Sequence, residues 1–194
     1  MTQANSDRIK AETRKQAAAS RAAASKANPE AAEKLAKFAE HLIAEFHPQN
    51  IAGYWPIKSE LDVFPLLSAL AMTPKVGLCL PITGAPETAL SFHRWQLGEA
   101  LDIGPYNTRQ PFPDKEELVP DLMLLPLLAF DEKLNRLGYG GGFYDRTLAS
   151  LAHKGNTVTA IGIAYESQKM DKVPTGYFDR RLDGVLTPSG LIMG

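Results

Sequence analysis

Residues 122–164 read LMLLPLLAFDEKLNRLGYGGGFYDRTLASLAHKGNTVTAIGIA, and their pattern predicts an α/β architecture. The apolar run at 122–125 predicts a buried strand, and a glycine-rich loop follows it. Residues 142–152 predict a helix, and residues 157–164 predict the next strand. A strand, a helix and a strand in this order are typical of parallel strands in a sheet whose faces are covered by helices.

The rest of the chain repeats this alternation. Helices are predicted at 28–47, where Asn28 and Pro29 form the start, and at 61–72. Further strands are predicted at 51–55, 76–80, 90–95 and 184–187, and an irregular connection rich in proline and charge at 104–120. The sequence therefore predicts one α/β domain with a mainly parallel sheet. Because ligands of such sheets bind at the carboxyl ends of the strands, the loop after Leu125 is the first candidate for a site.

Composition excludes several classes of function. The chain has 194 residues with 21 basic and 22 acidic side chains, so its formal net charge is −1. This balance gives no reason to expect a nucleic acid or an anionic membrane as partner, and local charge must hold any anionic ligand. The single cysteine, Cys79, lies in an apolar run and excludes an intrachain disulfide and a multi-cysteine metal site.

The sequence also lacks signals for membrane insertion and secretion. No stretch reaches the roughly 18 apolar residues of a membrane span, and the N-terminus has no apolar core of a secretory signal. Its alanine and arginine content faintly resembles an organelle transit peptide, but Asp7 and Glu12 argue against one. We expect a cytoplasmic protein.

The N-terminal segment 1–26 is locally basic, with six basic and two acidic side chains. Its alanine-rich composition without proline or glycine favours a helix. Lys10 and Arg14 are four residues apart and Arg21 lies two turns further, so all three fall near one face. Two interpretations stay open: a basic helix facing solvent, or an anion-binding surface that reaches back over an active site.

The glycine-rich loop carries the strongest chemical signal. Its four glycines, at 138 and 140–142, leave backbone N–H groups free to approach a ligand, and the following helix N-terminus favours a phosphate. Arg136 and Arg146 flank the loop and can form charge-assisted contacts with phosphoryl oxygens. Asp145 is a hard oxygen donor of the kind that binds Mg²⁺ beside phosphates. The loop matches neither a Walker A nor a dinucleotide-binding pattern, and the alternative is a flexible connection.

Residues 130–146 fit the pattern F-D-x-x-G-x-R-L-G-x-G-x-G-x-Y-D-R, and in this motif the chain resembles the 5-formyltetrahydrofolate cyclo-ligase family. One position departs from the pattern, since Leu134 stands where the family usually has glycine. Weaker matches outside the motif are Lys10 and Arg14, Tyr54-Trp55-Pro56 with Glu60, residues 165–168, and Pro174, Asp179, Asp183 and Thr187.

The resemblance implies a single domain over residues 1–194, in a three-layer sandwich like the NagB/RpiA/CoA-transferase-like fold, with residues 1–26 as a basic helix over the ATP site. It implies an ATP- and Mg²⁺-dependent closure of 5-formyltetrahydrofolate to 5,10-methenyltetrahydrofolate, with release of ADP and phosphate. The formyl oxygen would be phosphorylated to an iminium phosphate and displaced by N10. The partners would be ATP and the folate, with or without a polyglutamate tail, and the enzyme a monomer that binds no nucleic acid and no membrane.

The resemblance also implies roles for individual residues. The implied ATP contacts are Lys10, Arg14, Arg136, Leu137, Gly138, Tyr139, Gly140, Gly141, Gly142, Phe143 and Tyr144. The implied folate contacts are Trp55, Glu60, Tyr139, Gly140, Gly141, Gly142, Phe143 and Gln168. Arg136 and Tyr144 would be catalytic, and Asp145 with Asp183 would hold Mg²⁺. Trp55 would offer an aromatic wall to the pterin, and Glu60 an acceptor for its N–H groups.

Other functions stay open on the residues alone. A non-catalytic nucleotide- or RNA-binding module would use the basic N-terminal helix, but residues 1–26 contain no aromatic side chain for base stacking. A kinase of another small molecule would use the same loop. Tyr54 and Trp55 could also be core aromatics, and Asp179 and Asp183 part of a salt-bridged turn.

Overall fold

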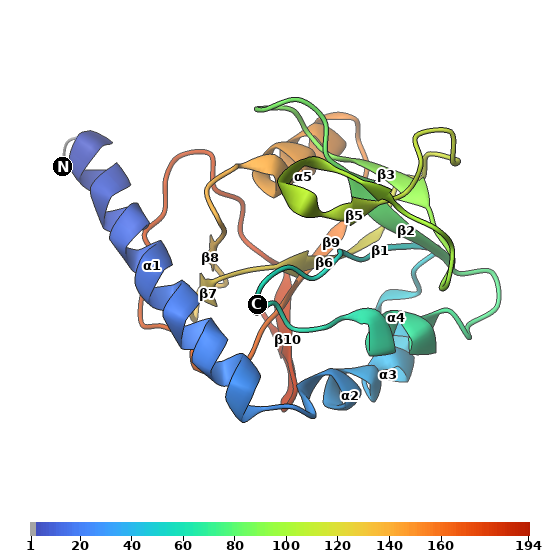
Figure 1. The fold of residues 1–194 in the computed structure, drawn as a ribbon, viewed down its shortest axis with the longest axis horizontal. Coiled ribbons are helices and arrows are strands. Elements are labelled where there is room, and N and C mark those ends of the chain that lie inside the picture. Colours follow the sequence, from blue (N-terminus) through green and yellow to red (C-terminus); the bar gives the residue numbers. More distant parts are fainter. Residues whose placement is uncertain (1–2) are drawn as a thin grey trace.

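The structure is a computed structural model that describes the backbone of residues 3–194 and the side chains of residues 8–194. A seven-stranded sheet crosses the molecule in the order β11-β10-β9-β6-β1-β2-β3 (Figure 1). Its strands are β1 (Asn50–Ala52), β2 (Gly77–Ile82), β3 (Ser91–Arg94), β6 (Leu122–Pro126), β9 (Thr159–Ile163), β10 (Gly184–Thr187) and β11 (Gly190–Met193). The five central strands pair in parallel and both edge strands pair antiparallel, which confirms the predicted mainly parallel sheet.

The central strand β6 explains why helices cover both faces. Leu122 and Leu124 belong to one apolar cluster, with residues of α2 (Ala31–Ala36), α3 (Ala39–Phe46) and α4 (Phe64–Leu70). Met123 and Leu125 belong to a second cluster, with residues of α5 (Phe143–His153). Successive side chains of a strand point to opposite faces, so a continuous apolar run requires a cover on each side. Figure 1 shows the resulting layers, with α5 on one face and α2–α4 on the other.

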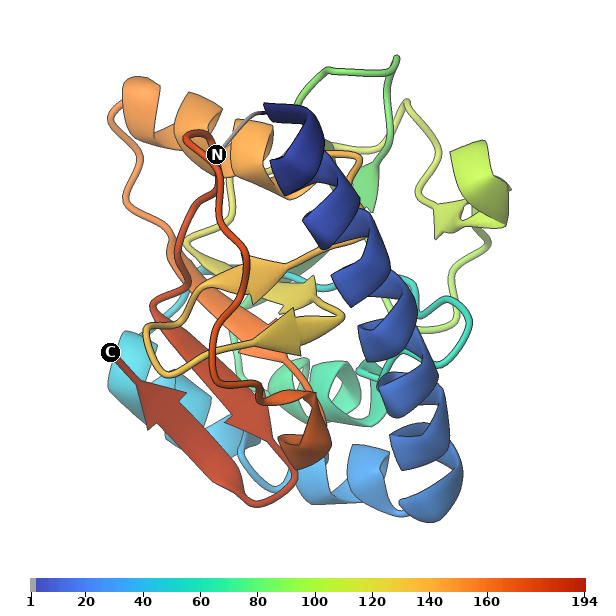
Figure 2. The same cartoon turned by 90° about the vertical axis from the view of Figure 1, so that its left-hand side faces the viewer.

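The N-terminal helix α1 (Gln3–Ala27) stands apart from these layers and runs along one side of the molecule (Figure 2). Ala17 and Ala18 of this helix pack against Leu128, Ala129, Leu137 and Val173. The predicted helix at 1–26 agrees with α1 from Gln3 onward, and residues 1 and 2 lie outside the described part. Within that part, no helix is both long enough and apolar enough to span a bilayer.

The helix predicted at 28–47 is two helices, and its predicted start is wrong. Asn28 donates its side-chain amide to the Ala24 carbonyl at the end of α1, and α2 begins only at Ala31. Short-range bonds from the N–H groups of Lys37 and Phe38 to the carbonyls three residues earlier end α2. The chain then restarts as α3. The apolar spacing continues across the break, which is why the sequence did not reveal it.

Several small elements were also not predicted. They are the hairpin of β4 (Asp102–Ile103) and β5 (Arg109–Gln110), the hairpin of β7 (Ala129–Phe130) and β8 (Arg136–Leu137), the edge strand β11, and the 3-10 turns at Pro105–Asn107 and Glu166–Gln168. Strands of two residues are too short to show the alternation that identifies a strand. The β7–β8 hairpin matters most, because it presents Arg136 to the region where the central strands end.

Candidate active site

A cavity of about 780 Å³ lies at the carboxyl ends of β1, β2 and β6. Pro126 ends β6, Trp55 follows β1 and Thr83 follows β2, and all three line the cavity. The N-terminal helix, the glycine-rich loop and the β4–β5 hairpin complete the wall. Its size suits a small-molecule ligand, and its place in the sheet is the one that the sequence predicts.

Most of the predicted site residues lie together in this cavity. The lining includes Lys10, Arg14, Trp55, Glu60, Arg136 and all residues from Leu137 to Asp145. These residues come from three separate parts of the chain, and the fold brings them to one place. Their individual binding roles remain predictions.

The glycine-rich loop has the backbone freedom that its composition predicts. Gly140 has φ +100° and Gly142 has φ +68°, in the left-handed region that side chains disfavour. A Cβ atom at Gly140 would lie 3.0 Å from Cζ of Arg14, so glycine also lets that arginine lie against the loop. Nε of Arg14 donates to the Gly138 carbonyl at 3.1 Å, and Arg146 donates to the Gly141 and Thr88 carbonyls. Both arginines thus hold the loop through its backbone carbonyls.

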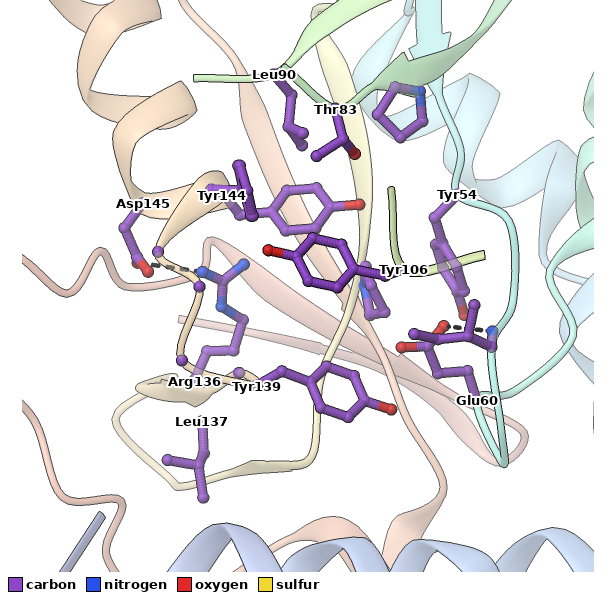
Figure 3. A pocket seen from close by; sticks show the side chains of 18 of the residues that line it. Tyr54, Glu60, Thr83, Leu90, Tyr106, Arg136, Leu137, Tyr139, Tyr144 and Asp145 are labelled. Carbon is purple, nitrogen blue, oxygen red and sulfur yellow. Dashed lines mark hydrogen bonds and ion pairs between the residues drawn. The ribbon is translucent and has the colours of Figure 1, made fainter. Parts of the chain in front are cut away.

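Arg136 is the central cation of the cavity. Its Nη2 donates to Oδ1 of Asp145 at 3.1 Å, as Figure 3 shows, and its guanidinium lies 5.4 Å from the ring centre of Tyr144. Its Nη1 is buried and has no hydrogen-bond partner within the described residues. A buried cationic donor without an acceptor is costly, so this nitrogen favours an acceptor from a ligand.

Glu60 lies on the other side of the cavity from Asp145 (Figure 3). Its Oε2 accepts the backbone N–H of Ile57 at 2.8 Å. Burial raises the pKa of Glu60 to about 7, although the Ile57 N–H and the nearby Arg21 both favour the charged form. Glu60 therefore titrates much nearer to neutral pH than an exposed glutamate does.

The two tyrosines beside this carboxyl group remain protonated. Burial raises the pKa of Tyr54 and of Tyr144 above the ordinary value of a phenol. Tyr54 donates its hydroxyl to the Leu61 carbonyl at 2.7 Å, so it supports the segment before α4. Tyr144 can act in the cavity as a hydrogen-bond donor but not as a base.

The basic face of α1 lies at the cavity, and this supports the second interpretation of that helix. Nζ of Lys10 forms an ion pair with Asp179 at 2.6 Å, and Arg14 contacts the glycine-rich loop. Arg21 is buried between α1 and the residues beneath it. The basic face of α1 is therefore packed against the rest of the chain and does not face solvent alone.

Two predicted residues do not reach the cavity. Gln168 is buried, where its amide donates to the Leu127 and Leu128 carbonyls and its oxygen accepts the Tyr165 N–H. Both the amide and the oxygen of this side chain are hydrogen-bonded to backbone groups, so Gln168 stabilises the backbone after β6. Nothing in its surroundings favours the predicted folate contact.

Asp183 is also displaced from its predicted partner. Its Oδ2 accepts the Ala160 N–H at 2.7 Å, and the residue lines a separate pocket of about 170 Å³ near β9. Asp183 thus does not line the cavity that Asp145 lines, and their joint role in holding Mg²⁺ stays a prediction. Among the side chains of residues 8–194, no group of three or more carboxylate, histidine or cysteine side chains forms a ready metal site.

Sequence analysis missed other residues of the cavity wall. Lys58 and Arg109 add positive charge, and Tyr106 lies at the tip of the β4–β5 hairpin with its ring 6.3 Å from that of Phe143. These three residues lie in segments without a motif, so only packing reveals them. Arg21, which the sequence places on the same helix face as Lys10 and Arg14, is buried and is not one of the residues that line the cavity.

Comparison with known proteins gives consistent results. The model of the 5-formyltetrahydrofolate cyclo-ligase family matches residues 6–188. A 5-formyltetrahydrofolate cyclo-ligase from Haemophilus influenzae is 32% identical over 163 residues, covering 81% of this chain and 85% of the relative. The enzyme of the same name from Escherichia coli K12 is 34% identical over 146 residues, covering 72% and 78%.

Solved structures give the same picture. The 5,10-methenyltetrahydrofolate synthetase of Aquifex aeolicus superposes with a TM-score of 0.75 at 26% identity, covering 95% of this chain and 92% of the other. The synthetase of the same name from Mycoplasma pneumoniae has a TM-score of 0.70 at 25% identity, with coverage of 92% and 98%.

Proposed function

Because the chain belongs to the 5-formyltetrahydrofolate cyclo-ligase family, we propose that it uses ATP and Mg²⁺ to convert 5-formyltetrahydrofolate to 5,10-methenyltetrahydrofolate. The family and the solved relatives support a ligase acting on 5-formyltetrahydrofolate. The requirement for ATP and metal, the intermediate and the residue roles are our proposal.

The proposed reaction has two steps. The formyl oxygen attacks the γ-phosphorus of ATP, ADP leaves, and the formyl carbon becomes an iminium phosphate. The N10 amine then attacks that carbon, the carbon–oxygen bond breaks, phosphate leaves and N10 loses its proton. Phosphorylation is needed because an amide-like oxygen is a poor leaving group. The protein must mainly position the reactants and neutralise charge.

The unpartnered Nη1 of Arg136 is the observation that carries this proposal. It is a buried cationic donor at the cavity, beside a glycine-rich loop at the start of α5. An oxygen of the transferred phosphoryl group is an acceptor of matching charge. The contact would strengthen as negative charge develops during transfer, which is how such a donor accelerates a reaction.

Asp145 lines the cavity and has the oxygen chemistry that fits a magnesium ion. Oδ1 of this carboxylate accepts from Arg136 and from the Arg180 N–H, and Oδ2 accepts no hydrogen bond within residues 8–194. Mg²⁺ commonly keeps waters and phosphate oxygens and takes one or two carboxylates from the protein. Asp145 would hold the ion, which would neutralise charge on the phosphates when bound.

The folate would lie toward Trp55 and Glu60. Trp55 is fixed by an edge-on contact with Phe64, with ring centres 5.1 Å apart, and lines the cavity as an aromatic wall. The Glu60 carboxylate would accept N–H groups of the pterin. Since Glu60 and Asp145 lie on different sides of the cavity, the pterin and the phosphates would have separate positions (Figure 3).

An absorbance assay tests the proposal. The protein is mixed with 5-formyltetrahydrofolate, ATP and Mg²⁺, and the ultraviolet absorbance of the methenyl product is followed together with ADP. We expect both products in equal amounts, and neither when ATP is omitted or the metal is chelated. ADP without the methenyl product would indicate a kinase of another substrate. No turnover combined with salt-sensitive RNA binding would support the nucleic-acid module instead.

A further inference from the structure

Arg21 is a buried arginine to which the proposed reaction assigns no role. Its exposed fraction is 2%, and it is one of only two buried residues among the described residues of α1, the other being Ala24. Burying a guanidinium is costly unless its N–H groups are paired. The contacts that pair it therefore indicate what the side chain is for.

The guanidinium of Arg21 joins three segments that are distant in the sequence. Nε donates to Oγ of Ser59 at 3.2 Å, and Nη1 donates to the Leu127 carbonyl at 3.0 Å. Nη1 also lies 3.6 Å from Oε1 of Glu60, and Nη2 donates to the hydroxyl of Tyr139. Arg21 thus connects α1 to the segment after β1, to the chain after β6 and to the glycine-rich loop.

Tyr139 is held by more than its hydroxyl. The guanidinium of Arg21 and Nζ of Lys58 each lie 5.2 Å from the centre of its ring. Cations at this distance are attracted to the aromatic face. One residue of the N-terminal helix therefore constrains both a proposed folate contact, Glu60, and a side chain of the proposed phosphate-binding loop.

We propose that Arg21 is a positioning residue, which orients Glu60 and Tyr139 from the N-terminal helix and so couples the docking of that helix to folate binding. This inference rests on the proposed function, because it assigns Glu60 to the folate. Lys10 and Arg14 reach the cavity from α1, and Arg21 anchors that same helix to Glu60 on the proposed folate side. Occupation of the two sides of the cavity would then be linked through α1.

The charge state of Glu60 gives this role a distinct signature. The charged and titratable groups around it are Arg21 from α1, Lys58 from its own segment, Tyr54 after β1, Tyr139 from the loop and Tyr144 from α5. Burial raises the pKa of Glu60 to about 7, whereas Arg21 and Lys58 lower it. Loss of Arg21 would raise the pKa of Glu60 further, so the carboxyl group would be protonated at neutral pH.

The test compares Arg21→Ala, Arg21→Lys and, as the matched control, Lys15→Ala, which removes an exposed lysine of the same helix. For each protein, kcat and KM and the calorimetric Kd of 5-formyltetrahydrofolate are measured from pH 5.5 to 9. In the unchanged protein we expect KM and Kd to rise as the pH falls through the pKa of Glu60. Arg21→Ala should move this midpoint upward by about one pH unit, which raises both constants about fivefold at pH 7 and about tenfold well below pH 7. Arg21→Lys should restore part of the shift, and Lys15→Ala should match the unchanged protein.

A loss that is the same at every pH, or no loss, would show that Arg21 is only structural. If Arg21→Ala does not fold, the same kcat, KM and Kd measurements are made on Arg21→Lys and on the double variant Arg21→Lys/Glu60→Gln. Glu60→Gln should abolish the pH dependence of folate binding, and adding Arg21→Lys to it should not bring a pH dependence back. A midpoint that is still shifted in the double variant would overturn the coupling between Arg21 and Glu60. Folate binding with the expected midpoint but no product would contradict the proposed reaction and leave this inference intact, whereas no folate binding would overturn both.

Discussion

At the scale of single residues, Leu134 shows how one departure from a motif is accommodated. It adopts φ +58°, the left-handed conformation that glycine favours, and yet its side chain is buried in the cluster that contains Phe130 and Leu182. Its N–H bonds to the Asp131 carbonyl at 2.9 Å, and its carbonyl accepts the Leu182 N–H at 3.0 Å. The turn before Arg136 therefore has a glycine-like backbone with a leucine in the core.

This combination predicts an inverted order of stability between alanine and glycine variants. Leu134→Ala loses buried contacts worth about 2–5 kcal/mol and keeps the backbone strain. Leu134→Gly loses the same contacts but relieves about 1 kcal/mol of left-handed strain, so it should be the more stable variant. Urea unfolding measures both. At Leu66, which is buried in helix α4, Leu66→Gly should be less stable than Leu66→Ala. If the glycine variant is the less stable one at both positions, the left-handed strain at Leu134 is refuted.

Arg136 and Asp145 carry the second prediction at this scale. Arg136→Ala and Asp145→Ala should each reduce kcat by about 10²–10³, the loss typical of removing one donor or charge that acts in the transition state. Steady-state assays of the methenyl product measure this. As a control, Arg94→Ala removes a cation of β3 that forms an exposed ion pair with Glu116, and it should leave turnover unchanged. Near-normal turnover in both cavity variants would refute their assignment.

At the scale of secondary-structure elements, α1 and the β7–β8 hairpin make one side of the cavity together. Ala17 and Ala18 pack against Leu128 and Leu137, and these short side chains let the helix approach the hairpin closely. The helix can then present Lys10 and Arg14 at the cavity. The alanines of α1 therefore pack against the hairpin, and its basic residues Lys10 and Arg14 line the cavity.

The double variant Lys10→Ala/Arg14→Ala tests this role of α1. We expect the Kd of ATP to rise by about a hundredfold or more, since the variant removes two charge-assisted hydrogen bonds that each contribute about 1.5–3 kcal/mol. The thermal midpoint should change little, because the Lys10–Asp179 pair is partly exposed. Isothermal calorimetry measures the binding. The exposed pair Lys15→Ala/Lys26→Ala is the control, and an equal loss of affinity there would indicate a general charge effect.

At the scale of the whole molecule, individual carboxyl groups make stability depend on pH in opposite directions. Burial raises the pKa of Glu60 to about 7, so folding favours its protonated form. Asp131 and Glu166 have lowered pKa values because hydrogen bonds from Asn135, Val173 and Ser189 favour their charged forms. The stability from these two groups is lost only as the pH falls through their lowered pKa values, well below the range in which Glu60 titrates.

Glu60 should therefore make the ligand-free protein less stable as the pH rises. Between about pH 4.5 and 7 the folded state holds more protons on this group than the unfolded state, so the free energy of unfolding falls by an amount on the order of 1–3 kcal/mol. Thermal melts from pH 5 to 8 measure the slope. Glu60→Gln should remove this part of it, and Glu45→Gln, at an exposed position, should not. The same slope in all three proteins would mean that Glu60 titrates normally.

Local sequence patterns are enough to predict the mainly parallel sheet, the glycine-rich loop and the family. The alternation of apolar runs and helices predicted the parallel strands, and residues 130–146 hold most of the predicted site in one continuous motif. These signals are local, because strand periodicity and glycine placement act over a few residues. The distant matches Trp55 and Glu60 also line the cavity.

Which of the remaining polar residues face the cavity depends on contacts that form only in the folded chain. Gln168 and Asp183 satisfy backbone groups elsewhere, whereas Arg21 is buried between Glu60 and Tyr139. The physical reason is that a side chain's partners depend on segments far away in the sequence. A charged or amide side chain in a folded protein goes where its donors and acceptors are paired, and no local pattern encodes that pairing.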